Sequence, residues 1–164
     1  MYARLILSGT PEPGKEEAAE NNLSLNVKYK DGQGNVIDPF SIEQGTNFVA
    51  EVTVTNPGLR GVYKGMALKQ ILPSGWEILN ARMDGFEEEN KDIPTYVDFR
   101  DDRVYTFFDL PSNSSKTFRV NLNAAYLGKF YLPAVYSEAM YEGTINSTVP
   151  GKWVEVVKPG HKGI

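Results

Sequence analysis

Short runs of alternating apolar and polar residues, most of them closed by glycine or proline, limit this chain to a small set of folds. In the longest run, Thr117–Ala125, every second side chain is apolar, and residues two positions apart line one face of a β-strand. Runs with the same period cover residues 23–29 and 48–54. Because short strands separated by turns are typical of all-β folds, we expect an antiparallel immunoglobulin-like β-sandwich of about seven to nine strands.

The same reasoning predicts the individual strands and turns. Strands, the shorter ones included, are expected over residues 22–30, 36–39, 48–55, 66–72, 76–80, 96–99, 104–110, 117–125, 129–141 and 152–157. Pro133 falls inside one of these ranges and has no N–H for a ladder, so that strand should be an edge strand or carry a bulge. The turn DGQGN at 31–35 and the acidic stretch DGFEEENKD at 84–92 are expected to be a hairpin turn and a solvated loop.

The polarity of the chain predicts four parts. Residues 1–10 contain the strand-like YARLILSG, which we expect to belong to a preceding domain of a longer chain, or to pack on this one as a guest. Residues 11–22 are polar and are expected to be a linker, since a helix this short is marginal. The sandwich should span 23–157 and supply a full core of its own, with Trp76 buried behind a Pro-Ser-Gly turn, and 158–164 should be a mobile tail.

Charge and composition exclude several classes of function. The net charge is −4 and the sequence pI about 5.1, which argues against a general nucleic-acid binder. The chain has no cysteine, so disulfides, thiolate metal sites and cysteine nucleophiles are ruled out. No apolar run approaches the roughly 20 residues that span a bilayer, and the first residues do not form a signal peptide.

Candidate catalytic groups are few. The single histidine, His161, lies in the glycine-containing tail, where nothing would orient it beside a nucleophile. Four aspartates occur close together in sequence and are interleaved with Arg100 and Arg103, which suggests a salt-bridged turn, with a calcium site or a catalytic carboxylate pair as alternatives. These aspartates are Asp98, Asp101, Asp102 and Asp109. We therefore predict that the chain is not an enzyme and has no catalytic, cofactor-binding or metal-binding residues.

Three segments together resemble one known family. QILPSGWE at 70–77, RDDRVY at 100–105 and NAAY at 123–126 are the most specific, and the resemblance extends from Leu5 to Val157. The sequence is similar to the C-terminal end of the large bacterial alpha-2-macroglobulins. This resemblance implies a macroglobulin-like sandwich over 23–157 and assigns residues 2–9 to the last strand of the preceding domain.

The resemblance also implies a function that belongs to a longer protein. Such proteins are periplasmic protease traps, in some cases tethered to the inner membrane by a lipidated N-terminus, in which cleavage of a bait region triggers covalent capture through a thioester. The chain is then expected to be a non-catalytic structural and interaction domain that contacts the neighbouring macroglobulin and thioester domains. Target proteases would be met only by the full-length protein, and any membrane contact would be made only through a lipid anchor outside this chain.

Two alternatives depend on particular residues. Ser41-Ile42-Glu43-Gln44 has the shape of the Cys-x-Glu-Gln thioester motif of that family, but serine supplies no sulfur, and we expect an ordinary loop. A stand-alone adhesin or carbohydrate-binding module is the alternative function. It would be favoured by an exposed row of aromatic side chains on one sheet face, since stacking on aromatic rings needs such a platform.

Overall fold

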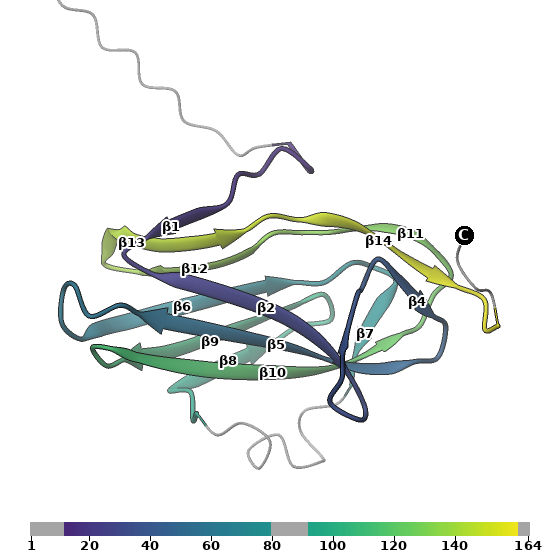
Figure 1. The fold of residues 1–164 in the computed structure, drawn as a ribbon, viewed down its shortest axis with the longest axis horizontal. Coiled ribbons are helices and arrows are strands. Elements are labelled where there is room, and N and C mark those ends of the chain that lie inside the picture. Colours follow the sequence, from purple (N-terminus) through teal and green to yellow (C-terminus); the bar gives the residue numbers. More distant parts are fainter. Residues whose placement is uncertain (1–11, 80–91, 161–164) are drawn as a thin grey trace, which may run out of the picture.

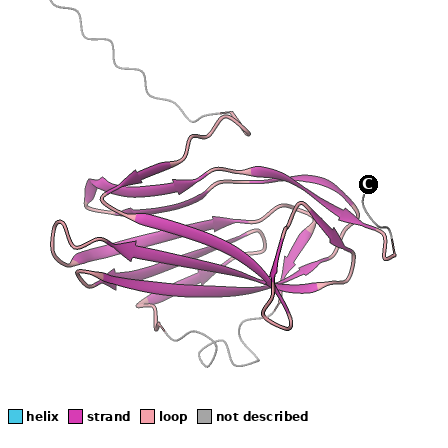
Figure 2. Ribbon diagram, in the orientation of Figure 1, coloured by secondary structure: helices cyan, strands magenta, loops and turns pink. Residues whose placement is uncertain are grey.

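The computed structural model describes residues 12–79 and 92–160. Fourteen strands and no helix occur in these ranges (Figures 1 and 2). The strands are, in chain order, β1 (Ala19–Asn21), β2 (Ser24–Asp31), β3 (Val36–Ile37), β4 (Ser41–Glu43), β5 (Asn47–Asn56), β6 (Tyr63–Ile71), β7 (Trp76–Ile78), β8 (Tyr96–Phe99), β9 (Arg103–Leu110), β10 (Ser114–Ala124), β11 (Gly128–Leu132), β12 (Val135–Ala139), β13 (Glu142–Val149) and β14 (Lys152–Val157). The described part of the chain therefore contains no helix that could cross a membrane.

Three sheets make up the sandwich. One sheet has the order β1-β13-β12-β6-β9-β8, the second β3-β2-β5-β10-β7, and the third β11-β14-β4. The pairings are antiparallel except for β4 with β14. The predicted all-β antiparallel sandwich is confirmed, but the expected number of strands is too low. The expected ranges include the short strands β3, β7 and β8, whereas no strand was expected at β1, at β4 or at the eight-residue β13.

The alternation in β10 does what its period predicts. Phe118, Val120 and Leu122 are buried, whereas Arg119 and Asn121 between them are only partly buried. Opposite them in β5 lie Val52, Ala50 and Phe48, so that apolar side chains meet on the same face of the sheet.

Two adjoining clusters of buried side chains form the core. The first is built around Met66, Leu68 and Phe108, and the second around Phe48, Trp76 and Leu122. Val27 of β2 packs against both clusters and lies where they meet. The prediction of a full core with Trp76 buried is confirmed, since only 3% of Trp76 is exposed.

Two segments of the N-terminal half in which no strand was expected each contain one. Part of the expected linker is β1, which pairs with β13 and whose Ala19 carbonyl accepts a hydrogen bond from the Ser147 hydroxyl at 2.9 Å. The backbone N–H and C=O groups at the edge of β13 need hydrogen-bond partners. The backbone of a polar segment provides them as well as that of an apolar segment. The expected loop at 41–44 contains β4, because Ile42 is buried in the second core cluster while its backbone pairs with β14.

The segment expected to be one strand over 129–141 is two. β11 lies in the three-stranded sheet and β12 in the six-stranded sheet, and Pro133 lies between them. Proline interrupts a ladder because it has no N–H, and here the chain uses that interruption to change sheets. The expected strand of 1–10, most of the acidic loop 84–92, and His161 with the rest of 161–164 lie outside the described residues. The described beginning of the expected tail is held at one point, because the Gly160 amide donates to Glu43 Oε1 at 3.2 Å.

Candidate functional site

The four aspartates grouped by sequence do not form one site. At the β8–β9 hairpin, Asp98 pairs with Arg100 at 3.1 Å and Asp102 with Arg103 at 2.6 Å, which confirms the predicted salt-bridged turn. The Arg103 guanidinium lowers the pKa of the Asp102 carboxyl by hydrogen bonding to it. Asp109 lies at the far end of β9, where its carboxylate accepts a hydrogen bond from the Gly65 amide at 2.9 Å. Three of the four aspartates are thus engaged by an arginine or by a backbone amide.

The other polar motifs are used by the local backbone. Asp31 Oδ1 accepts hydrogen bonds from the amides of Gln33 and Asn35 at 2.9 Å, so the carboxylate stabilises the β2–β3 turn, as predicted for a hairpin. In the segment with the shape of a thioester motif, Gln44 Nε2 donates to the Ala125 carbonyl at 2.8 Å. Among the described residues, no group of three or more His, Cys, Asp or Glu side chains is placed to hold a metal ion.

Aromatic side chains on the three-stranded sheet do not form a flat platform. Tyr131 and Trp153 face each other across β11 and β14 with their ring planes at 70°, and Lys129 Nζ lies 5.4 Å from the Trp153 ring. The Tyr131 hydroxyl is already occupied, since it donates to Glu16 Oε2 at 2.5 Å and accepts from the Gly14 amide at 2.6 Å. Stacking against a sugar needs an open ring face, so this arrangement gives the carbohydrate-binding alternative little support.

A different surface has the features of a contact site. Four large apolar side chains are exposed on the β5–β6 loop and the β12–β13 turn, with exposed fractions from 45% to 90%. They are Leu59, Val62, Met140 and Tyr141. We call these four residues the apolar end. Tyr141 is the most exposed, at 90%, and its ring lies over Gly65, where an added Cβ would come within 3.2 Å of it.

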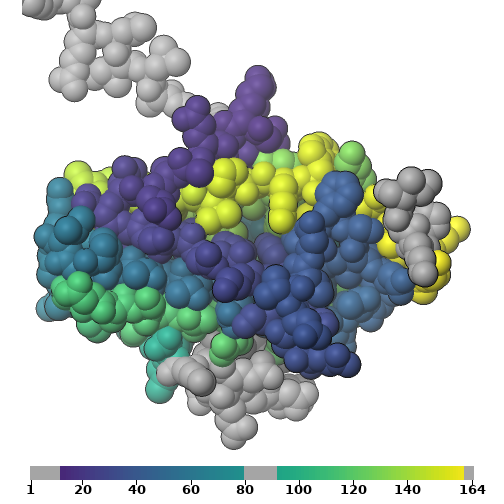
Figure 3. Space-filling model, in the orientation of Figure 1, coloured from purple at the N-terminus to yellow at the C-terminus, as the bar shows by residue number. Residues whose placement is uncertain are grey.

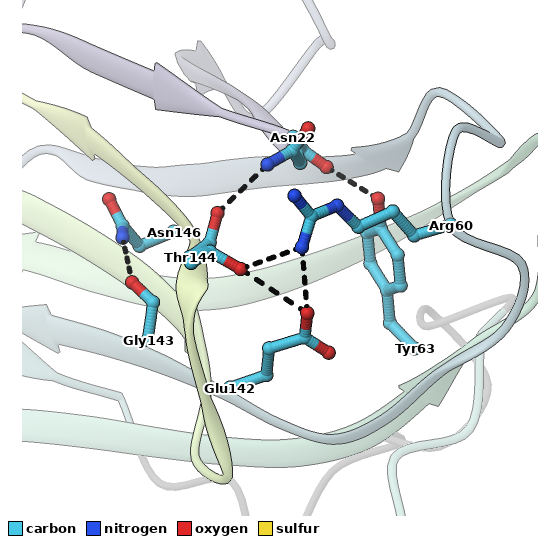
Figure 4. Close-up of polar contacts among 7 residues, drawn as sticks. All are labelled: Asn22, Arg60, Tyr63, Glu142, Gly143, Thr144 and Asn146. Atoms are coloured by element: carbon cyan, nitrogen blue, oxygen red, sulfur yellow. Dashed lines mark hydrogen bonds and ion pairs between the residues drawn. The ribbon is translucent and has the colours of Figure 1, made fainter.

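Polar contacts hold the two loops of the apolar end together (Figure 4). Arg60 Nη1 donates to Glu142 Oε1 and to Thr144 Oγ1, each at 2.9 Å. Asn22 Nδ2 donates to the Thr144 carbonyl at 3.0 Å, and the Tyr63 hydroxyl donates to the Asn22 carbonyl at 2.7 Å. We call these five residues the clasp. An exposed apolar cluster on loops tied together in this way loses little conformational entropy when a partner covers it.

Sequence reasoning did not find the apolar end. Tyr141 was expected to be the last residue of a strand, and the loop around Leu59 carried no expectation beyond a turn. The four residues are ordinary in type and lie far apart in sequence, so their proximity follows only from the pairing of β12 with β6 and β13. Two large apolar residues in succession, Met140 and Tyr141, directly before Glu142-Gly143 are the one signal that pointed there, and it is a weak one.

Comparison with known proteins gives a consistent result. Residues 23–143 match a family model described as the bacterial alpha-2-macroglobulin MG10 domain. The alpha-2-macroglobulin of Rickettsia conorii is 30% identical over 148 residues, which is 87% of this chain and 8% of that protein. The alpha-2-macroglobulin of Pasteurella multocida is 25% identical over 141 residues, covering 85% of this chain and 7% of that protein. The chain thus spans less than a tenth of the length of these relatives.

Solved structures show the same fold. Native alpha-2-macroglobulin from Escherichia coli, in a structure running from domain MG7 to the C-terminus, superposes with a TM-score of 0.77 at 17% identity, over 92% of this chain and 25% of that one. Salmonella alpha-2-macroglobulin reacted with methylamine gives a TM-score of 0.74 at 20% identity, over 88% of this chain and 10% of that one. At these identities the likeness concerns the fold.

Proposed function

Since this chain belongs to the bacterial alpha-2-macroglobulin MG10 domain family, we propose that it is a structural and interaction domain near the C-terminal end of a larger protease inhibitor. In this proposal the domain performs no chemistry of its own. It packs against neighbouring macroglobulin and thioester domains of the parent protein, and it shifts or becomes exposed when a target protease cleaves the parent. The parent acts in the periplasm and is tethered to the inner membrane by a lipid at its own N-terminus.

The apolar end is the single observation that carries this proposal. Leu59, Val62, Met140 and Tyr141 present apolar surface on two loops that the clasp holds in one arrangement. Exposed apolar clusters of this kind mark surfaces that a partner covers. A domain of a multidomain chain is always close to such partners. The alpha-2-macroglobulins of Rickettsia conorii and Pasteurella multocida are more than ten times as long as this chain.

The described carboxylates also support a non-catalytic role. Asp98, Asp102 and Glu51 pair with basic side chains, and Asp31 stabilises a turn. Hydrolytic chemistry with paired carboxylates needs two of them facing one cleft. The proposal therefore assigns these groups to folding and solubility.

Two measurements test this proposal. The isolated 164-residue chain is expected to leave the cleavage of a protein substrate by trypsin unchanged. Stoichiometric inhibition would overturn the proposal that inhibition is a property of the parent protein and not of this domain. An antibody raised against the chain is expected to detect, in fractionated cells of the source organism, a periplasmic or membrane-associated band many times heavier than 18.3 kDa. A band near 18.3 kDa would instead identify a free-standing protein and would favour the adhesin or carbohydrate-binding alternative.

A further inference from the structure

A groove lined by none of the four residues of the apolar end opens in the sandwich. It encloses about 390 Å³ between the β2–β3 hairpin and the segments around Pro133 and Pro150, within the roughly 300–1,000 Å³ range of ligand pockets. Its walls come from the two ends of the chain, which lie against each other in Figure 3 as purple and blue atoms beside yellow ones. Val27, which touches both core clusters, contributes to the wall formed by β2.

The first feature of the groove is an open strand edge. β3 pairs only with Tyr29 and Lys30, two of the eight residues of β2. The Asp31 amide donates to the Asn35 carbonyl at 2.9 Å, and the backbone groups that face one edge of an antiparallel strand recur every second residue. Tyr29 and Val27 therefore turn their N–H and C=O groups to the same edge as Asp31. β3 has ended before it reaches Val27, so a ladder could continue there.

Proline explains why β3 stops, and it also shapes the groove. Pro39 follows β3 directly after Asp38 and cannot donate a ladder hydrogen bond. Pro133 and Pro150 stand in the opposite wall and have no N–H either. A segment inserted into the groove would therefore pair with β2 alone. Val27 and Lys28 line the groove and are not paired with β3, so such a segment would pair with β2 there, at roughly 3.3 Å per residue.

The second feature is the character of the walls. Apolar side chains line both sides, among them Val36 and Ile37 on one and Leu132 and Val149 on the other. The charged residues in the lining are two lysines, Lys28 and Lys152, and one aspartate, Asp38. Asp38 lies 4.0 Å from Lys152 Nζ, at the limit of an ion pair, so a carboxylate from an incoming segment would find a better-matched partner in the lysines.

The third feature is where the chain enters the domain. The Gly14 amide and the Glu16 carboxylate are both held by the Tyr131 hydroxyl, and Tyr131 adjoins Leu132 of the groove wall. Gly14 and Glu16 are therefore held next to the strand that continues into this wall of the groove. Segments of the same polypeptide would reach the groove at high effective concentration.

We propose that this groove binds an extended segment of the parent polypeptide, from outside residues 1–164, which adds to the open edge of β2 as a strand. The segment is apolar at alternate positions and carries a carboxylate that meets Lys28 and Lys152. This inference depends on the proposed function, because only a multidomain parent supplies such a segment. Recognition combines backbone hydrogen bonds along the strand edge with apolar pockets for alternate side chains.

Photo-cross-linking in the intact parent protein tests the proposal. Val36 lines the groove and is 65% exposed, so p-benzoylphenylalanine in its place would touch a bound segment without filling the core. The cross-linked peptide, identified by mass spectrometry, is expected to come from the parent sequence outside residues 1–164. Cross-links to residues 1–11, to a second copy or to a different protein would overturn the proposal, as would no cross-link.

Control variants separate this proposal from the proposed function. The same photo-reactive residue at Tyr141 reports contact between the apolar end and a neighbouring domain. Cross-linking from Tyr141 but not from Val36 would refute the groove proposal alone. The absence of a cross-link from both positions would contradict the proposed function as well. Lys28→Glu with Lys152→Glu is expected to abolish the Val36 cross-link with an unchanged melting temperature. Lys64→Glu, at an exposed position on β6, is expected to leave the cross-link intact.

Discussion

A Cβ atom built on Gly151 would lie 2.6 Å from the backbone carbonyl oxygen of Leu132. It would also clash with the Tyr131 hydroxyl oxygen. The chain thus passes so closely over the end of β11 that only glycine leaves room, and the contact is made by backbone, which cannot rotate away. The hydrogen bonds of Gly14 and Glu16 to the Tyr131 hydroxyl depend on this close contact between Gly151 and the end of β11. So does the wall of the groove that contains Leu132 and Pro150.

Gly151→Ala is therefore expected to destabilise the fold. Overpacking against backbone costs about 1–3 kcal/mol, and we expect a loss near 2 kcal/mol in the free energy of unfolding, measured by urea denaturation. Gly143→Ala is the matched control, because a Cβ there meets nothing within 4 Å and neither glycine has positive φ. Equal stabilities for the two variants would show that the close approach does not constrain the fold.

The two tryptophans should report opposite environments. Trp76 is 3% exposed and packs edge-on against Phe48 at 4.9 Å, whereas Trp153 is 52% exposed. In a Trp153→Phe variant the remaining emission is expected to be blue-shifted and poorly quenched by iodide. Trp76→Phe should leave red-shifted emission that iodide quenches readily. Red-shifted, quenchable emission from the Trp153→Phe variant would contradict the burial of Trp76.

Gln70 offers a stabilising substitution. Its side chain is buried at 3% exposure, and its Nε2 has no hydrogen-bond partner in the described part of the molecule. An unsatisfied buried donor costs about 1–3 kcal/mol, so Gln70→Met, which keeps the shape, should raise the free energy of unfolding by about 1 kcal/mol. Gln70→Glu, which buries a charge instead, should lower it. A destabilised Gln70→Met variant would mean that the amide is satisfied in solution.

Glu51 links stability to pH. It is 9% exposed and pairs with Lys30 and Arg119, each at 2.8 Å. Burial raises the pKa of Glu51, but the hydrogen bonds and charges of these two partners outweigh it, and the pKa is lowered from its ordinary value of 4.5. A carboxyl whose pKa is lower in the folded state stabilises the fold above its unfolded pKa, and this contribution is lost as pH falls through the folded value.

Glu51→Gln should accordingly lower stability at pH 7 by about 2 kcal/mol. Glutamine keeps one acceptor oxygen, so the loss corresponds to about one hydrogen bond to a charged group, roughly 1.5–3 kcal/mol. The substitution should also flatten the decline in stability as the pH falls below about 5. Chemical denaturation across that range measures both effects. Glu155→Gln, at an exposed position on β14, controls for the loss of one carboxylate. An unchanged slope in Glu51→Gln would refute the assignment.

The clasp should order a loop without adding much stability. The Arg60–Glu142 pair is about half exposed, and exposed pairs contribute about 0–1 kcal/mol. Arg60→Ala is therefore expected to change the free energy of unfolding by less than about 1 kcal/mol, yet to speed amide hydrogen exchange in residues 57–62. Arg100→Ala, which breaks the exposed pair with Asp98, should leave exchange in that loop unchanged. Identical exchange in both variants would show that Arg60 does not hold the loop.

Local patterns were enough to predict most of the longer strands. The period of Phe118, Val120 and Leu122 identified β10 and its buried face, and the turn chemistry of Asp31 identified the β2–β3 hairpin. Patterns failed where a strand exists because of its partner. β1 is polar and β4 has three residues, so neither carries a periodic signal of its own.

By itself the sequence determined the fold class, the faces of the long strands, the burial of Trp76 and the resemblance to a family. Each of these depends on neighbours within a few residues or on a string of residue types. Only the tertiary structure decided that Ala19 meets Ser147, 128 residues away, that Met140 and Tyr141 join Leu59 at one end, and that Val27 opens onto a groove with Lys152. Backbone hydrogen bonds pair strands without regard to their separation along the chain, so contacts of this kind leave no mark in a local pattern.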